Sequence, residues 1–149
     1  MLPDELERYL HCNIPLTRAM GVSAIDVGEQ SVTLGAPLAP NINHNGTAFG
    51  GSASAVAMLA AWAVLRTRLD AAGINARLVI RRNTMEYEAP IAGDFEAHAS
   101  IAEPGDWETF LTVFQRRGKA RIRVSTVLEQ DGLIVAQFAG EFVALRSES

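Results

Sequence analysis

The sequence has little cysteine and no excess of basic charge. Cys12 is the single cysteine among 149 residues, which excludes an internal disulfide framework and a cysteine-based zinc site and is typical of a reducing compartment. The 17 acidic residues outnumber the 13 basic ones, for a formal net charge of −4. Such a charge argues against binding nucleic acid through a broad basic surface. We therefore expect a cytoplasmic location and no nucleic-acid partner.

Long hydrophobic runs and internal repeats are also lacking. The N-terminal segment interrupts its leucines with charged residues, so it has no signal-peptide core and nothing marks the chain for export. Residues 41–65 carry no charged side chain, but Ala, Gly and Ser dominate there. The apolar part is shorter than the roughly 20 residues of a membrane span, so we expect no membrane partner. No repeat or linker divides the chain, and residues 1–149 are expected to form one domain.

The first third of the chain combines a helical pattern with a strand pattern. Residues 1–22 are expected to form an N-terminal helical flank, with a helix over residues 3–13. Residues 24–27 and 30–38 then predict two antiparallel strands joined by a turn at residues 28–29.

The central segment predicts a long helix over residues 50–72, which Gly73 ends. Between Ala53 and Leu65 this helix carries no charge, and Ser54 is its only polar residue. A helix that is apolar nearly all round must be buried.

The rest of the chain is rich in strand patterns. These predicted strands cover residues 77–88, 95–102, 109–116, 120–129 and 133–145. Asp131-Gly132, between the last two, is the strongest hairpin signal. A long curved antiparallel β-sheet wrapped around one buried central α-helix satisfies this order, so the predicted fold class is α+β.

One motif leads into the predicted central helix, and a second lies at the end of the predicted strand that follows this helix. The pattern N-x-x-G-T-x-H-G-G is matched at Asn43, Gly46, Thr47, Gly50 and Gly51. Phe49 stands at the position of the histidine. The pattern Y-x-x-P-x-x-G-D is matched at Tyr87, Pro90, Gly93 and Asp94. With these motifs the chain resembles the PaaI-like branch of the hot-dog fold thioesterases, and most of all a thioesterase domain family that also occurs fused to N-acetyltransferase domains.

This resemblance implies a hot-dog fold and an acyl thioesterase that hydrolyses acyl-CoA or acyl-carrier-protein thioesters by water attack. It also implies a homodimer, or a dimer of dimers, with the sites at the interface. No cofactor is expected, and the three histidines show no zinc-type spacing that would predict a metal site.

The chemistry of the catalytic candidates follows from the start of the central helix. A helix N-terminus presents unpaired N–H groups and a positive dipole end, so Gly50 and Gly51 are predicted to form an oxyanion hole. The resemblance places the family's active-site asparagine at Asn43, whose amide is expected to hold the attacking water or the thioester carbonyl. The alternative is a loop asparagine that caps a turn. His44 is a secondary candidate, as a general base. The alternative for the glycines is tight packing of the helix under the sheet.

One departure from the family pattern leaves the general base open. The resemblance places a catalytic carboxylate nine positions after the motif histidine, where this chain has Met58. Methionine accepts no proton, and the first carboxylate on the helix, Asp70, lies about 30 Å from Gly50 at about 1.5 Å per residue. Glu86 and Glu88 are weak substitutes. The second hypothesis is therefore a non-hydrolytic acyl-CoA or acyl-carrier binding protein of fatty-acid metabolism; a hydratase, which uses a paired histidine and carboxylate, ranks last.

Substrate-binding candidates come from three places. Arg121 and Arg123 share one strand face and are predicted to clamp phosphates or an acidic carrier protein, although a charged strand edge explains them equally well. The other candidates are Asn45, Gly46, Thr47, Phe49, Met58 and Tyr87. We also expect the acyl chain to run along the central helix, where small residues leave room or simply pack the core.

Overall fold

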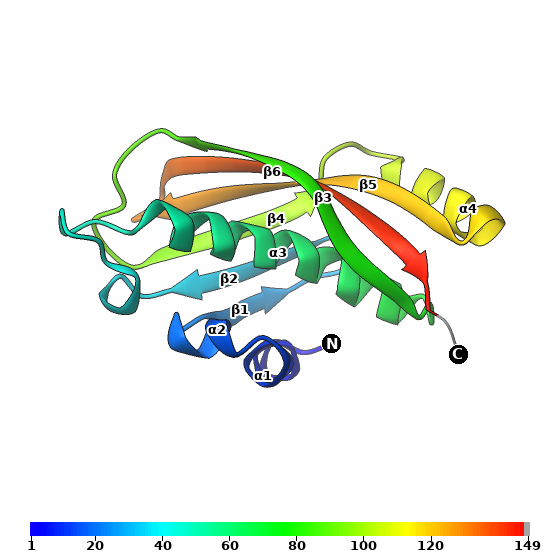
Figure 1. Ribbon diagram of the computed structural model, residues 1–149, viewed down its shortest axis with the longest axis horizontal. Coiled ribbons are helices and arrows are strands. Elements are labelled where there is room, and N and C mark those ends of the chain that lie inside the picture. Colours follow the sequence, from blue (N-terminus) through cyan, green and yellow to red (C-terminus); the bar gives the residue numbers. More distant parts are fainter. Residues whose placement is uncertain (148–149) are drawn as a thin grey trace.

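The computed structural model describes residues 1–147, which form a curved six-stranded sheet around one long helix (Figure 1). The helices are α1 (Pro3–Asn13), α2 (Pro15–Ala19), α3 (Gly50–Ala71) and α4 (Asp106–Arg117), with a 3-10 turn at Ala39–Asn41. The strands are β1 (Ser23–Val27), β2 (Ser31–Ala36), β3 (Ala76–Tyr87), β4 (Phe95–Ile101), β5 (Lys119–Gln130) and β6 (Leu133–Arg146). The order is β1-β2-β4-β5-β6-β3, and every pairing is antiparallel. The predicted α+β fold class is confirmed.

Helix α3 lies against the concave face of the sheet because its contact residues are small. Ala53, Ala57, Ala60 and Ala61 are at most 1% exposed. Thr126 of β5 donates a hydrogen bond to the carbonyl oxygen of Ala57 at 3.0 Å, which places the two backbones close together. These alanines fill the core between the helix and the sheet. Within residues 1–147, no helix has the length and apolarity that crossing a membrane requires.

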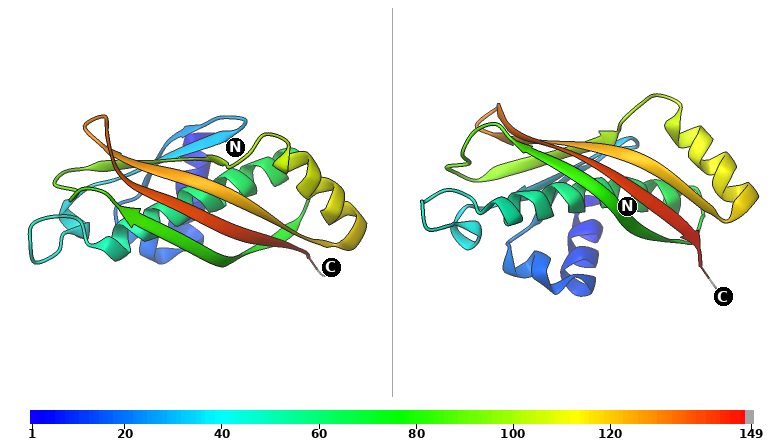
Figure 2. Two further views of the ribbon diagram at one scale, coloured as in Figure 1. Left: turned by 90° about the horizontal axis from the view of Figure 1, so that it is seen from above. Right: turned by 45° about the horizontal axis from the view of Figure 1, so that its top comes forward.

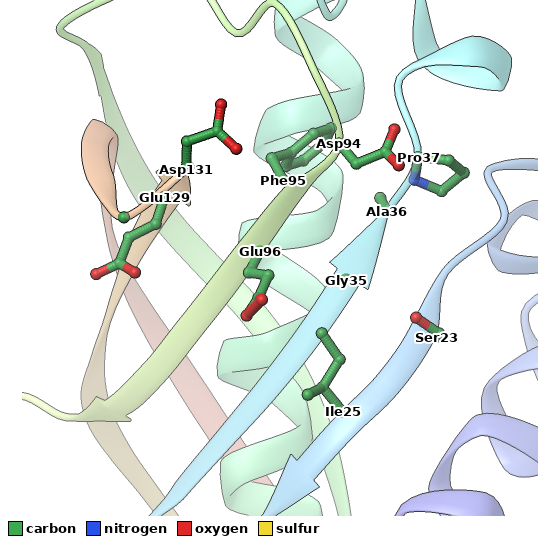
Figure 3. A pocket seen from close by; sticks show the side chains of 11 residues that line it. Ser23, Ile25, Gly35, Ala36, Pro37, Asp94, Phe95, Glu96, Glu129 and Asp131 are labelled. Carbon is green, nitrogen blue, oxygen red and sulfur yellow. The ribbon is translucent and has the colours of Figure 1, made fainter.

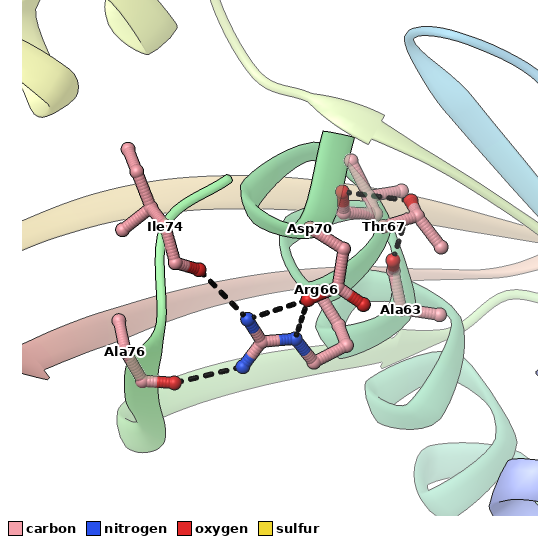
Figure 4. A network of polar contacts seen from close by, with 7 residues as sticks. Ala63, Arg66, Thr67, Asp70, Ile74 and Ala76 are labelled. Atoms are coloured by element: carbon pink, nitrogen blue, oxygen red, sulfur yellow. Dashed lines mark hydrogen bonds and ion pairs between the residues drawn. The ribbon is translucent and has the colours of Figure 1, made fainter. Parts of the chain in front are cut away.

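Arg66 fixes the C-terminal end of α3 to the beginning of β3 (Figure 4). Its guanidinium donates to the carbonyl oxygen of Ala76 at 2.7 Å and to that of Ile74 at 3.3 Å, and it pairs with Asp70 at 2.9 Å. The Arg66 side chain is 12% exposed, whereas that of Asp70 is 44% exposed, so the bonds to the backbone carbonyls are better shielded from water than the ion pair. Arg66 therefore ties the last turns of the helix to the chain that leads into β3.

The N-terminal flank packs beside β1 (Figure 1). Leu6 and Leu10, four residues apart on α1, are fully buried. Glu7, between them, accepts a hydrogen bond from the N–H of Ala24 in β1 at 3.0 Å. The flank therefore supplies both apolar contact and a partner for an outward-facing N–H of the edge strand.

The predicted strand over residues 109–116 is wrong, because this segment belongs to helix α4. Its β-branched residues favour a strand, but its aromatic residues are spaced three and four apart and form a buried helical face. They are Trp107, Phe110 and Phe114. Gly105 and Gly118 both adopt positive φ and bound the helix. The basic residues that follow position 115 therefore lie around the junction between α4 and β5. Helix α4 packs on β5, at the end of the molecule away from the start of α3 (Figure 2).

We predict that Ala57→Leu lowers the free energy of unfolding by about 1–3 kcal/mol, because the added side chain forces α3 away from β5. Urea unfolding followed by circular dichroism measures this change. Ala71→Leu, on the exposed last turn of the same helix, is the matched control and should shift stability by about 0.5 kcal/mol or less. Equal midpoints for the two variants would contradict the packing described above.

Candidate functional site

A tight turn at residues 43–47 precedes α3, and the Asn43 side chain organises it. Its Oδ1 accepts hydrogen bonds from the N–H groups of Asn45 at 2.8 Å and Thr47 at 3.2 Å. Its Nδ2 donates to the Thr47 hydroxyl at 3.1 Å. Gly46, with φ of +79°, occupies a conformation that side chains rarely adopt. His44 and Asn45 are exposed at the tip, so the structure brings four of the predicted site residues together beside Asn43.

Asn41 ties this turn to the rest of the fold, a role that the sequence did not reveal. Its side chain is 2% exposed. The Nδ2 group donates to the carbonyl oxygens of Met20 at 2.9 Å and Pro37 at 2.8 Å. The backbone carbonyl oxygen of Asn41 accepts a hydrogen bond from the N–H of Phe49 at 2.7 Å. Asn41 therefore joins the N-terminal flank, the turn and the entrance of α3. The sequence feature that points to this role is the position of Asn41, two residues before Asn43 of the motif.

The first two residues of α3 have free N–H groups. The N–H groups of Ser52 and Ala53 both donate to the carbonyl oxygen of Phe49, at 2.9 and 3.1 Å. For Gly50 and Gly51, no acceptor lies within reach among the residues that the structure describes, as expected for the first turn of a helix without a side-chain cap. Two adjacent donors at the positive end of a 22-residue helix form an arrangement suited to a developing negative charge.

Two aromatic side chains contact the peptide groups that carry these donors. The Tyr87 hydroxyl donates to the carbonyl oxygen of Gly50 at 2.8 Å. That carbonyl and the N–H of Gly51 belong to one peptide group, so the hydroxyl orients and polarises this donor. The ring of Phe49 lies against the α-carbon of Gly51, where a Cβ would collide with it. A side chain at position 51 would therefore force the exposed Phe49 ring, which stands at the position of the motif histidine, to move.

An apolar groove of about 320 Å³ runs along α3 between the N-terminal flank and β3. Its lining consists of Ile14, Leu16, Met20, Ala55, Met58, Leu59, Trp62, Leu78, Ile80 and Phe142. At 1.5 Å per residue, Ala55 lies about 8 Å and Trp62 about 18 Å along the axis from Gly50. Met58 therefore faces the open groove, on a different side of α3 from the buried alanines.

Among residues 1–147, no carboxylate lines this apolar groove. Glu86 and Glu88 on β3 and just beyond it are exposed, and Glu88 accepts a hydrogen bond from Gln137 at 2.7 Å. Their surroundings match a solvated sheet edge. The structure supplies no acidic substitute for Met58 along the helix.

Arg121 and Arg123 are not beside the glycines. They line an arginine groove of about 620 Å³ between α4 and strands β3, β5 and β6. Arg123 is opposite Glu141, which is opposite Arg82. Tyr87 lies five residues along β3 from Arg82, or about 17 Å at about 3.3 Å per residue. The phosphate clamp predicted from the sequence therefore lies apart from the helix start.

A third hollow, of about 470 Å³, is lined by carboxylates where β2, β4 and β5 end or begin (Figure 3). The carboxylates are those of Asp94, Glu96, Glu129 and Asp131. Asp94, a residue of the second motif, accepts a hydrogen bond from the N–H of Leu38 at 2.8 Å and so links the start of β4 to the chain that follows β2. Among residues 1–147, no three His, Cys, Asp or Glu side chains are grouped as a metal ion would require.

Residues 3–146 match the family model described as "Putative thioesterase (yiiD_Cterm)". A solved protein of unknown function from Chlorobaculum tepidum TLS is 27% identical, with a TM-score of 0.89 and 98% of both chains covered. A solved protein described as a putative thioesterase from Shewanella oneidensis is 26% identical, with a TM-score of 0.86 and 96% of both chains covered. A thioesterase from Haemophilus influenzae shares the fold at 12% identity, with a TM-score of 0.78 and coverage of 98% of this chain and 92% of that one. No curated protein matches significantly. The predicted hot-dog fold and thioesterase resemblance are confirmed.

We predict that Asn43→Ala loosens the turn without unfolding the protein. The backbone N–H groups of Asn45 and Thr47 lose their acceptor, and their hydrogen-exchange rates should rise about tenfold. Asn45→Ala is the matched control, because that side chain makes no hydrogen bond within residues 1–147. Mass spectrometry or NMR measures the exchange. If Asn43→Ala leaves both rates unchanged, the turn does not depend on this side chain.

Proposed function

We infer the reaction from one premise: the chain belongs to the family described as "Putative thioesterase (yiiD_Cterm)" and is a thioester hydrolase. We propose that its substrates are acyl thioesters of coenzyme A or of an acyl carrier protein, as intermediates of fatty-acid metabolism. One observation carries the placement of the reaction: the free N–H groups of Gly50 and Gly51 begin the same helix whose side, from Ala55 onward, lines an apolar groove. The exposed free thiol of Cys12 supports a cytoplasmic location.

In this proposal the two N–H groups bind the oxygen of the thioester carbonyl. Water adds to the carbonyl carbon, and the oxygen gains the negative charge that Gly50 and Gly51 stabilise. The carbon–sulfur bond then breaks, and the departing thiolate takes up a proton while the acid remains. Removing one such donor from a hydrolase costs about 10²–10³ in kcat. Tyr87 acts as a positioning residue through its hydrogen bond to the Gly50 carbonyl.

His44 is the proposed general base. Its imidazole lies on the turn immediately before α3, and this side-chain type accepts protons near neutral pH. Asn43 is committed to hydrogen bonds within the turn, so we propose that it contributes by holding His44, Asn45, Gly46 and Thr47 in place around the carbonyl. The attacking water would give its proton to His44.

The apolar groove is the proposed site of the acyl chain. It begins about 8 Å along the helix from Gly50, and its lining presents far more apolar than polar surface. Met58 and Trp62 then contact the chain. Phe49, which is 58% exposed, would shield the thioester from water at the entrance.

We also propose a homodimer that pairs β3 with the β3 of a second copy. Strand β3 is 12 residues long and forms one edge of the sheet. Val79 and Tyr87 on it are 41% and 55% exposed. A long edge with exposed apolar side chains is a template for strand pairing. Pairing there would bring the second copy beside Tyr87 and the start of α3, and a dimer of dimers would require a further surface.

Gly50→Pro is predicted to lower kcat by about 10²–10³, because proline removes one oxyanion donor. Proline is favoured at the first position of a helix, and Phe49, with φ of −58° and ψ of 131°, is compatible with a following proline. Gly50→Ala keeps the N–H and places a Cβ in ordinary contact with Tyr87, so it should retain turnover. The assay is thiol release from short, medium, long and aromatic acyl-CoAs. Equal kcat for the two variants would exclude the Gly50 N–H as a donor.

His44→Gln should lower kcat on the same substrates if the imidazole is the base. No turnover by the wild type on any substrate, with saturable binding by calorimetry, would instead favour a binding protein.

For the dimer, light scattering after size-exclusion chromatography should give about twice the chain mass of 16.1 kDa. Val79→Lys places a charge on the edge strand and should shift the protein toward the monomer. Ile134→Lys, at a residue 50% exposed beside the β5–β6 turn, is the control and should leave the mass unchanged. A wild-type monomer at all concentrations would contradict the proposed pairing.

A further inference from the structure

The arginine groove concentrates positive charge in a chain whose net charge is negative. Four of the 13 basic residues line it, namely Arg81, Arg82, Arg121 and Arg123. Only two carboxylates, those of Asp106 and Glu141, accompany them. The strand register assembles this set, because Arg82, Glu141 and Arg123 lie opposite one another on three adjacent strands.

Two of these four guanidinium groups approach the Glu141 carboxylate, and the other two form no ion pair among residues 1–147. Arg81 donates to Glu141 at 2.7 Å, and this bond lowers the pKa of the Glu141 carboxyl below its ordinary value. Arg121 approaches the same carboxylate at only 4.0 Å. Within residues 1–147, neither Arg82 nor Arg123 forms an ion pair. The groove therefore holds donors that are free to bind an anion.

The wall formed by α4 gives the groove its depth and its apolar part. Phe110 of α4 is 2% exposed and Ile122 of the adjoining strand β5 is 4% exposed, so both residues are anchored in the core. Thr109 adds a hydroxyl. Guanidinium groups bind phosphate oxygens in pairs and stack on flat rings. A concave site with an apolar wall and an arginine rim fits a phosphorylated nucleoside better than the convex surface of a carrier protein.

We propose that the arginine groove binds the adenosine 3′-phosphate 5′-diphosphate end of coenzyme A. This inference rests on the proposed function and narrows its substrate class to coenzyme A thioesters. The groove lies about 17 Å along β3 from Tyr87 and hence from the Gly50 carbonyl. The extended pantetheine arm, which separates nucleotide from thioester, bridges such a separation. Arg121 and Arg123 bind phosphate, and the adenine lies against the α4 wall.

Calorimetry with adenosine 3′,5′-bisphosphate tests the site without any need for turnover. The double variant Arg121→Gln with Arg123→Gln should weaken binding about tenfold or more. The control is Arg116→Gln with Arg117→Gln, which removes the same charge from exposed residues of α4 outside the groove and should bind as the wild type does. Adenosine, which lacks phosphate, should bind far more weakly than the bisphosphate.

Kinetics separates this proposal from the proposed function. The groove variant should raise KM for an acyl-CoA about tenfold with little change in kcat, while hydrolysis of the same acyl group on N-acetylcysteamine stays at the wild-type rate. Absence of bisphosphate binding to the wild type, equal loss in the control variant, or a KM effect seen only with an acyl carrier protein would each overturn the proposal. Loss of turnover on both thioesters with nucleotide binding intact would count against the hydrolytic mechanism alone.

Discussion

The close approach of α3 to the sheet is the constraint on which the other features depend. The small alanine side chains on one face of the helix let Thr126 reach the carbonyl of Ala57 and bury that face against the sheet. This approach fixes the axis of α3 within the curve of the sheet. It also determines that one end of the helix emerges beside the end of β3, where Tyr87 lies.

The start of α3 is held from three sides, yet its own donors stay free. Asn41 bonds to the N–H of Phe49, Ile91 accepts the N–H of Ala48, and Tyr87 bonds to the carbonyl of Gly50. Each contact fixes a backbone group next to the free N–H groups without occupying them. Donors fixed before the reaction need no reorganisation when charge develops, which is the condition for effective electrostatic stabilisation.

Sequence patterns predicted those parts of the fold that depend on residues close together in the chain. The uncharged run over residues 53–65 revealed the buried helix, and turn residues separated most of the strands. The segment 109–116 was mistaken for a strand because its β-branched residues outweighed aromatic spacing, whose buried partners lie on β5. The arginine groove could not be foreseen in full. Arg82 and Arg123 lie on the same groove because both are opposite Glu141 of β6. This register depends on a bulge between Ile80 and Arg82, which no local sequence pattern indicates. The hydrogen bonds of the Asn43 amide within its own turn match the turn-capping role that the sequence offered as the alternative to a catalytic one.

The two edge strands of the sheet, β1 and β3, differ in what covers them. This difference limits where further strands can be added to the sheet. On β1 the flank helix α1 covers the edge, and Glu7 takes up the N–H of Ala24. That edge has no free donor at Ala24 to offer a neighbour. A sheet with one occupied edge can be extended on the other side only, and a two-fold pairing of identical edges leaves nothing further to add. The N-terminal flank thus occupies a position on the β1 edge where a strand of another molecule would otherwise bond, so this edge is a poorer template for aggregation than an uncovered one.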